Sequence, residues 1–341
     1  MPTSHIIGTG SSIPERVLSN KELEQIVETS DEWIIRRSGI QERRISHTDR
    51  KETATDLATK ASAKALAMAG IKADELDLIV AGTVTPDRQF PSTACMVQNN
   101  LHALNAAAYD LSAGCTGFLF ALKTVDDSIR AGSCRNALVI GVERLSSILN
   151  WQDRGTCVLM GDGAGAVVVS AKDEPGGVLS THIQSDGTFW ELLHTEWGNT
   201  YIPNTLDGMD IKPFYMIMEG NKVFKIAVER MSDIAGKALI HNNFTSENIS
   251  LVIPHQANIR IIQALAKSLG VSMDKVFTNI QKYGNTSSAT IPIALDEAYR
   301  EGRIDKGNNI LMVSFGAGLT WASSVVQWSM HRLHEGKEES I

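Results

Sequence analysis

The sequence contains few cysteines, and none of them is paired or clustered. Only four occur among the 341 residues, at spacings that suit neither a disulfide framework nor a metal site: Cys95, Cys115, Cys134 and Cys157. This scarcity argues against a small secreted domain held together by disulfides. We therefore expect a reduced, cytoplasmic protein with no metal centre.

Long apolar runs and an excess of positive charge are also missing. No hydrophobic segment approaches the roughly 20 residues that cross a bilayer, and no basic and apolar leader precedes His5-Ile6-Ile7-Gly8. The net charge of -7 disfavours nucleic acid as a ligand. We expect no membrane partner, no nucleic-acid partner and no export.

What the chain does contain is enough apolar sequence for a large core and an internal repeat. Hydrophobic residues make up 43% of the chain, which allows one large core or two fused ones. The second half repeats the first in outline, since three segments correspond in order: Leu76–Ala81 with Ser250–Pro254, Tyr109–Cys115 with Val276–Asn285, and Ala137–Gly141 with Asn309–Ser314. The repeat predicts an α/β protein with two duplicated halves, whose strand-end loops meet at one place.

Cys115 lies where a strand turns into a helix. An apolar run ends at Leu111, small residues follow, and the segment from Thr116 to Ile129 has helical apolar spacing. Backbone N–H groups and the helix dipole at such a corner lower a thiol pKa and favour the thiolate. On position alone, an inert buried cysteine is the more common interpretation, so its partners must decide.

A histidine and an asparagine of the second half are the candidate partners. His255 directly follows a strand end in Pro254-His255-Gln256, and Asn285 lies in the turn Gly284-Asn285-Thr286-Ser287. A pseudo-twofold relation between the halves would bring both to the cavity of Cys115. In a cysteine peptidase, the asparagine orients a histidine that takes the thiol proton. In a thioester condensation, histidine and asparagine instead donate hydrogen bonds to an enolate oxygen.

Two further segments are candidates for a phosphate or nucleotide site. Between Asp31 and Arg44, Trp33 stands beside four arginines, which suits a phosphorylated, adenine-bearing ligand; the alternative is a solvated charged helix. The segment from Arg154 to Val169 reads as two strands joined at a glycine-rich turn. No helix follows those glycines, so Gly161–Gly165 is interpreted as backbone packing and not as a phosphate loop.

Six motifs, in order over nearly the whole chain, resemble the β-ketoacyl-acyl-carrier-protein synthase III family of the thiolase superfamily. They are Trp33 with Arg37, Ala113–Phe118, Gly161–Ala166, Pro254–Asn258, Gly284–Ser287 and Phe315–Trp321. The resemblance implies a thiolase-like α/β fold in five αβαβα layers. It implies one half at residues 1–172 that carries the cysteine and another at 173–341 that carries the histidine and asparagine.

The resemblance also implies an activity and its partners. A homodimer would transfer an acyl group from acyl-CoA, with acetyl-CoA as the expected donor, to Cys115 and release CoA. Malonyl-acyl carrier protein would then lose CO2, and its carbanion would attack the acyl-enzyme to give 3-oxoacyl-acyl carrier protein. This ping-pong acyltransferase reaction initiates fatty-acid synthesis without a cofactor.

Roles for individual residues follow from the same resemblance. His255 and Asn285 would hold the enolate oxygen, backbone N–H groups of Cys115 and Ala317 the oxyanion of acylation, and Phe315 would position His255 and the malonyl group. The residues implied in binding are Trp33, Arg37, Arg154 and Asn221 for CoA, Gln256, Ala257, Asn258, Ile259 and Arg260 for acyl carrier protein, and Phe90 for the partner subunit's acyl pocket.

Other interpretations remain open at this point. A starter-unit or ester-forming acyltransferase of secondary metabolism could use the same cysteine, histidine and asparagine. A cysteine hydrolase is a further alternative, although no Asp or Glu is placed to support His255 and the surface at Trp33 suits CoA. The aromatic segment from Phe189 to Tyr215 could reshape the acyl or pantetheine channel, or pack a longer surface loop.

Overall fold

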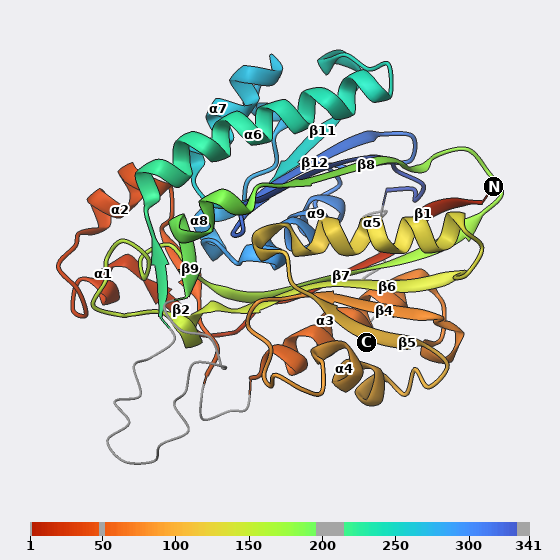
Figure 1. Ribbon diagram of the computed structural model, residues 1–341, viewed down its shortest axis with the longest axis horizontal. Coiled ribbons are helices and arrows are strands. Elements are labelled where there is room, and N and C mark those ends of the chain that lie inside the picture. The colour runs from red at the N-terminus through yellow and green to blue at the C-terminus, as the bar shows by residue number, and fades with distance from the viewer. Residues whose placement is uncertain (1, 48–51, 196–214, 333–341) are drawn as a thin grey trace.

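The computed structural model describes residues 2–47, 52–195 and 215–332. Two β-sheets lie one above the other (Figure 1). The first has the order β1 (Thr3–Ser12), β7 (Asp162–Lys172), β6 (Asn136–Arg144), β4 (Leu78–Gly82) and β5 (Ala107–Leu111). The second has the order β11 (Leu251–Pro254), β12 (Asn309–Gly316), β13 (Thr320–Gln327) and β8 (Gly177–Ser185).

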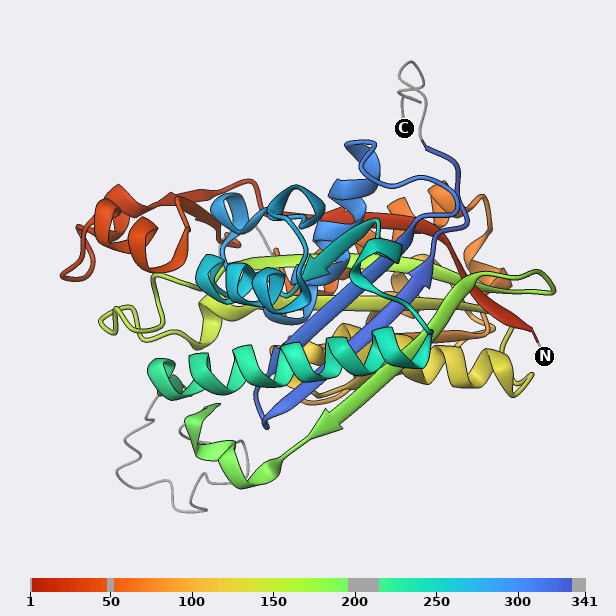
Figure 2. The ribbon, with the colours of Figure 1, turned by 90° about the horizontal axis from the view of Figure 1, so that it is seen from above.

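Helices cover both sheets and fill the space between them. The outer face of the first sheet carries α3 (Ala54–Ala69) and α4 (Thr93–Leu101), and α5 (Gly117–Arg130) and α9 (Thr290–Arg300) lie between the sheets. The second sheet is covered by α6 (Gly220–His241), which crosses β12 and β13 in Figure 2, and by α7 (Ile259–Leu269). These layers are α, β, α, β and α, so the predicted fold class is confirmed.

The two sheets share one order and one set of strand directions. In the first, β4 and β6 are parallel, and β7 and β1 add antiparallel neighbours. In the second, β11 and β12 are parallel, and β13 and β8 follow in the same way. The repeat read from the sequence therefore corresponds to a repeated sheet topology.

One part of the predicted repeat is matched only in outline. The segment at 276–285 has no strand that matches β5; it makes a single bridge from Val276 to Val252. After Phe277 donates to Val252 O at 2.9 Å, the chain turns into the short helix α8 (Ile280–Tyr283) and leaves the sheet. The second sheet consequently ends at β11.

The predicted strand pair at 154–169 is wrong in its first half. Asp153 closes a local turn, because its side chain accepts from the Gly155 N–H at 2.8 Å and its carbonyl from the Cys157 N–H at 3.0 Å. Only the second half forms a strand, β7. Residues 154–160 thus form a loop beside the cavity described below.

Local sequence explains the elements that carry the site. The strand β4 is buried at every position, as expected of a parallel strand with helices on both faces. The helix α3 begins with a capping box of Thr53 and Asp56 and ends at Gly70 in the left-handed conformation. Both devices fix where the chain enters and leaves the outer helical layer.

Smaller elements gather at the carboxyl ends of the strands. They are β2 (Val17–Ser19), α1 (Asn20–Leu23), α2 (Asp31–Ser38), β3 (Glu42–Arg44), and the hairpin of β9 (Leu193–Thr195) and β10 (Met216–Met218). Among the described residues, no helix has both the length and the apolar character needed to cross a membrane.

Candidate active site

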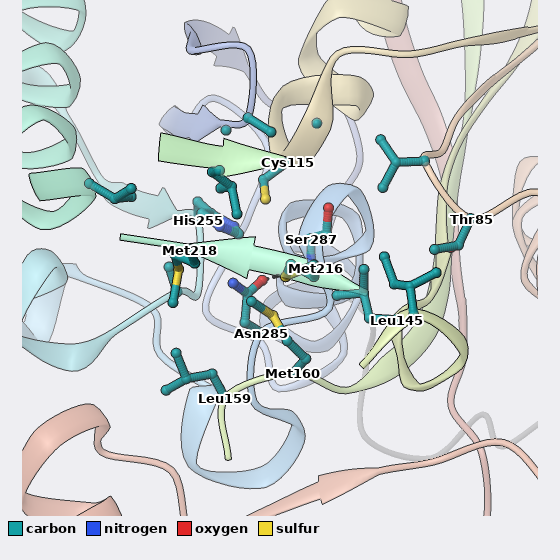
Figure 3. A pocket seen from close by; sticks show the side chains of 18 of the residues that line it. Thr85, Cys115, Leu145, Leu159, Met160, Met216, Met218, His255, Asn285 and Ser287 are labelled. Carbon is teal, nitrogen blue, oxygen red and sulfur yellow. Dashed lines mark hydrogen bonds between the residues drawn. The ribbon is translucent and has the colours of Figure 1, made fainter. Parts of the chain in front are cut away.

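A cavity of about 1460 Å³ opens where the carboxyl ends of strands from both sheets meet. Cys115, His255 and Asn285 all line it and lie close together in Figure 3. The two halves of the chain supply these side chains separately. The convergence predicted from the repeat is therefore confirmed.

Cys115 is held at a tight corner between the two halves. It lies in the 3₁₀ turn η2 (Gly114–Thr116), directly before α5, and its carbonyl accepts from the Ser314 hydroxyl at 2.8 Å. Gly114 has a φ of +55°, and a Cβ there would come within 2.6 Å of the Ala317 nitrogen. Glycine is thus required for the elbow to approach the end of β12.

The pKa of Cys115 moves opposite to the direction predicted from the helix dipole. Burial raises the pKa of this thiol to about 11, and the Glu143 carboxylate adds to the increase. Hydrogen bonds from Ser287 and from the backbone N–H groups of Cys115 and Ala317 act in the opposite sense but do not outweigh burial. In the free enzyme the resting sulfur is a thiol, and acylation needs a proton acceptor.

His255 follows β11 and is only 3% exposed. Burial lowers its pKa to about 3, so the imidazole is neutral near pH 7. Its Nδ1 lies 2.7 Å from the Thr290 hydroxyl, which also lies 2.9 Å from the Ser287 carbonyl oxygen. The Thr290 hydroxyl has one proton, which it can donate either to the Ser287 carbonyl oxygen or to His255 Nδ1. A donor role of His255 toward the cavity requires the ring proton on Nε2, and the Thr290 hydroxyl must then turn its proton from Ser287 O to Nδ1.

The orientation of Asn285 follows from its backbone neighbour. The Ser287 N–H donates to Asn285 Oδ1 at 2.8 Å. The amide group must therefore present its Nδ2 hydrogens elsewhere, and its side chain lines the cavity. Asn285 is thus suited to donate a hydrogen bond to a substrate oxygen.

The predicted CoA surface lies at another part of the same cavity. Trp33, Arg37, Arg154 and Asn221 all line it. The Arg154 guanidinium is 5.2 Å and that of Arg37 is 5.7 Å from the centre of the Trp33 ring. Two cations beside one aromatic ring suit a phosphorylated ligand with a stacking base.

The predicted carrier-protein patch is narrower than expected. Gln256 is 1% exposed, and its amide donates to the carbonyls of Pro254 at 2.8 Å and Phe277 at 3.2 Å. The prediction that Gln256 belongs to a docking surface is wrong, because its side chain ties β11 to the chain after Val276. Arg260 is exposed and lies over the Phe224 ring at 5.3 Å.

The other residues of this patch are less exposed than Arg260. Asn258 caps α7 by accepting from the Arg260 N–H at 2.9 Å, and it donates to Arg37 O at 3.0 Å. Ala257 is half-buried and lines the cavity, and Ile259 is half-buried against the cluster beneath α2. Arg260 is the member of this stretch most available to an acidic partner.

Phe315 and Phe90 occupy contrasting positions. Phe315 ends β12, is 4% exposed and lines the cavity with Ala317. Phe90 is 82% exposed and is not part of the cavity of its own chain. Of the aromatic residues in the segment 189–215, Phe189, Trp190 and Tyr215 are described and do not line the cavity, whereas residues 196–214 lie outside the described residues.

Three polar residues beside Cys115 or His255 have no role that the sequence predicts. Glu143 is fully buried at the end of β6, Ser287 belongs to a quoted motif, and Thr290 begins α9. A charged residue directly after the apolar run Ala137–Val142, at the same sheet edge as Cys115, was a signal for Glu143.

Within the described residues, no group of three metal-ligating side chains is close enough to hold an ion.

Comparison with known proteins gives the chain its family. Models of 3-oxoacyl-[acyl-carrier-protein] synthase III match residues 109–187, and models of its C-terminal part match 239–328. The β-ketoacyl-[acyl-carrier-protein] synthase III of Caldanaerobacter subterraneus subsp. tengcongensis is 51% identical over 95% of this chain and 97% of the relative. The chain belongs to the β-ketoacyl-[acyl-carrier-protein] synthase III family.

Solved structures of relatives agree with this assignment. The synthase III of Aquifex aeolicus VF5 has 47% identity and a TM-score of 0.89, with 95% of this chain and all of that chain covered. The priming β-ketosynthase of the R1128 polyketide pathway has 36% identity and a TM-score of 0.91, with 96% and 97% covered. Members of the synthase III family are condensing acyltransferases, so the chain is an enzyme of that class.

Proposed function

We propose that this synthase III condenses an acyl group from acyl-CoA, with acetyl-CoA as the expected donor, with malonyl-acyl carrier protein. The products are 3-oxoacyl-acyl carrier protein, CoA and CO2, and the reaction initiates fatty-acid synthesis in the cytoplasm. The observation that carries the proposal is a single cavity lined by Cys115, His255 and Asn285 and by the cationic surface at Trp33. No cofactor takes part.

The first half-reaction transfers the acyl group to the enzyme. The Cys115 thiolate attacks the thioester carbonyl, and the oxyanion is held by the N–H groups of Cys115 and Ala317, both of which point at the sulfur. Collapse of this intermediate breaks the bond to the CoA sulfur. The nucleotide of CoA would lie between Trp33 and Arg154, with Arg37 near a phosphate and Asn221 along the pantetheine arm.

The second half-reaction uses the two donors from the rear half. Loss of CO2 from the malonyl thioester leaves an enolate, whose oxygen would accept from His255 Nε2–H and Asn285 Nδ2–H. The enolate carbon attacks the acyl group on Cys115, and the thiolate leaves. Buried Phe315 would exclude water and position His255 and the malonyl carboxylate in this step.

Arg260 would attract the acidic carrier protein at the cavity mouth, with Ala257, Asn258 and Ile259 beside it.

We further propose a homodimer formed along β5, an edge strand whose residues are unusually exposed. In that dimer Phe90, which lies outside its own cavity, would reach the acyl pocket of the partner subunit.

Intact-mass analysis tests the first half-reaction. After incubation with acetyl-CoA, the wild type should gain one acetyl group, and Cys115→Ser should gain none. Malonyl-acyl carrier protein added to the acyl-enzyme should then remove the acetyl group with release of CO2. His255→Ala and Asn285→Ala should be acylated but release little CO2, and a mutant that condenses at the wild-type rate would contradict these roles.

A second candidate is priming of a polyketide, favoured by the similarity to the R1128 ketosynthase. Both reactions share the acyl-enzyme, so the carrier protein separates them. Comparing condensation rates with fatty-acid and polyketide carrier proteins, over a panel of acyl-CoA donors, decides between the two. A cysteine hydrolase is disfavoured, because His255 Nδ1 meets the Thr290 hydroxyl and not a carboxylate.

A further inference from the structure

Glu143 is a buried carboxylate for which the proposed reaction has no use. It is 0% exposed and accepts from the Val84 N–H at 3.1 and 3.2 Å, from Thr85 Oγ1 at 2.5 Å and from Ser287 Oγ at 3.1 Å; Thr83 Oγ1 lies at 3.4 Å. Among the described residues, no ion pair to Glu143 is found. Burying an unpaired carboxylate costs free energy. One of the groups that donate to Glu143, the Ser287 hydroxyl, lies beside the reactive sulfur of Cys115.

Ser287 connects Glu143 to Cys115. Its hydroxyl donates to Glu143 Oε1 at 3.1 Å, and it lies near enough to the Cys115 sulfur to lower the pKa of that thiol. In Figure 3 the Ser287 hydroxyl and the Cys115 sulfur face the same part of the cavity. With the Ser287 proton given to the carboxylate, its oxygen is free to accept the thiol proton.

The backbone at Ser287 supports a role for this hydroxyl. Ser287 has a φ of +49°, in the left-handed region where glycine is at ease and other residues are strained. Such strain persists where surrounding structure holds the residue, commonly at functional sites. Here the Ser287 N–H is bound by Asn285 and its hydroxyl lies between Cys115 and Glu143.

The acid strengths of the three groups favour Glu143 over His255 as the final proton acceptor. Burial raises the pKa of Glu143 to about 7, lowers that of His255 to about 3, and raises that of the Cys115 thiol to about 11. A base is most effective when its pKa lies near the working pH. Glu143 meets that condition, whereas His255 would hold a proton only in strong acid.

We propose that Ser287 is a catalytic residue of acylation and that Glu143 is the positioning residue behind it, together relaying the Cys115 proton. The Cys115 S–H bond breaks as its proton passes to Ser287 Oγ, while the Ser287 proton passes to Glu143. The thiolate then forms its bond to the acyl carbon, and the carbon–sulfur bond to CoA breaks. The proton returns from Glu143 through Ser287 to the CoA thiolate, so no proton is gained or lost overall.

The pH dependence of acylation is the readout that a merely structural role would not change. Among the residues that the structure describes, those around Glu143 present hydroxyl and backbone N–H groups from the 83–85 loop and from residues 287–288, together with the titratable Cys115 thiol. The wild-type acylation rate should therefore rise with pH to a plateau, with its inflection near pH 7. We would measure it by rapid quench with acetyl-CoA and intact mass.

Ser287→Ala and Glu143→Gln should slow acylation at pH 7 by roughly 100-fold, the ordinary size of such proton-transfer effects. Both should lose the inflection near pH 7, and the rate should keep rising toward the pKa of the thiol. The rate at which iodoacetamide alkylates Cys115, measured on the peptide that carries this residue, should lose the same inflection in both variants. This assay does not require CoA to bind. His255→Ala should lose condensation but keep the inflection in acylation.

Asp162→Asn is the matched control. Asp162 is another fully buried carboxylate near the site, and it accepts from Ser46 and Ser146 without a contact to Cys115. This variant should keep the inflection even if it is less stable. Persistence of the inflection in Ser287→Ala would overturn the proposal, and so would its loss in His255→Ala. Ser287→Ala decides alone if Glu143→Gln does not fold, since it leaves the other donors to Glu143 in place.

Discussion

The Ser287 N–H donates to Asn285 Oδ1 at 2.8 Å and thereby fixes which end of the asparagine amide faces the cavity. Because a backbone N–H can only donate, the amide oxygen is committed to it. The Nδ2 group is then left as a donor for substrate. This one contact separates an enolate-stabilising asparagine from one that only supports the histidine.

Asn285→Asp should abolish condensation while sparing acylation. A carboxylate can still accept from the Ser287 N–H, but it offers no hydrogen to the enolate and repels its charge. Loss of one such donor lowers a rate by roughly 100- to 1000-fold. Release of CO2 from malonyl-acyl carrier protein measures the loss, and acetyl incorporation by mass should stay near wild type. Acylation that fails equally would contradict the assigned role.

The depressed pKa of His255 makes the native state sensitive to acid. An unfolded histidine binds a proton below its ordinary pKa of 6.5, whereas the buried ring stays neutral down to about 3. The unfolded state therefore gains protons first, and stability falls as pH drops from 6.5 toward 3. His255→Leu should remove up to roughly 1.4 kcal/mol per pH unit of this loss of stability.

Urea unfolding of wild type and His255→Leu between pH 4.5 and 8 measures that difference. The opposing contribution of Glu143, whose pKa burial raises, is present in both proteins and cancels in the comparison. His331→Leu, at an exposed position, is the control and should follow the wild-type profile. A constant difference between wild type and His255→Leu across this range would show that His255 titrates normally.

Much of the fold and the three central residues could be predicted from the sequence, because local pattern carries them. Apolar runs that end in small or polar residues mark strand ends, and parallel strands bring such ends to one edge. Cys115 and His255 both follow runs of this kind. Their meeting required only the assumption that the halves are duplicated.

What sequence could not supply depends on burial. The helix corner at Cys115 predicts a lowered pKa, but the depth of the surrounding core, set by distant elements, raises it. Gln256 stands among surface-like polar letters, and only the folded chain shows its amide turned inward to Phe277. The sequence places a charge at Glu143 directly after an apolar run, but only the folded chain shows that this carboxylate is fully buried.

Trp33→Ala should weaken the binding of acyl-CoA, and only through lost contacts with the nucleotide of CoA. Removing the ring that lies beside Arg154 and Arg37 should raise KM for acetyl-CoA by about 10-fold, in the range of a desolvated cation–π contact. With acetyl-pantetheine, which lacks the nucleotide, the variant should match wild type. Trp190→Ala removes an exposed tryptophan that does not itself line the cavity, and it should leave the KM for both substrates unchanged. An equal rise in KM for both substrates would show that the substitution acts through the fold and not through nucleotide binding.

Arg260→Glu should impair carrier-protein binding without affecting acylation. The reversed charge would repel an acidic surface at the cavity mouth, and we expect the Kd for malonyl-acyl carrier protein to rise at least about 10-fold at low salt, less at high salt. Lys306→Glu is the control, because exposed Lys306 precedes β12 at the end opposite the cavity. An equal effect of both substitutions would indicate net charge and not a docking site.

The exposed edge of β5 predicts a homodimer that a single charge should disrupt. Leu104, just before β5, is 75% exposed, and β5 pairs on one side only, with β4. Because open edges and apolar side chains beside them are normally covered, light scattering should give about twice the chain mass of 37.1 kDa. Leu104→Asp should shift the protein toward monomer. Ile240→Asp, at an apolar residue of α6 that is 78% exposed on the opposite outer layer, should leave the dimer intact. A wild-type protein of single-chain mass, or equal dissociation by both substitutions, would rule out this edge as the interface.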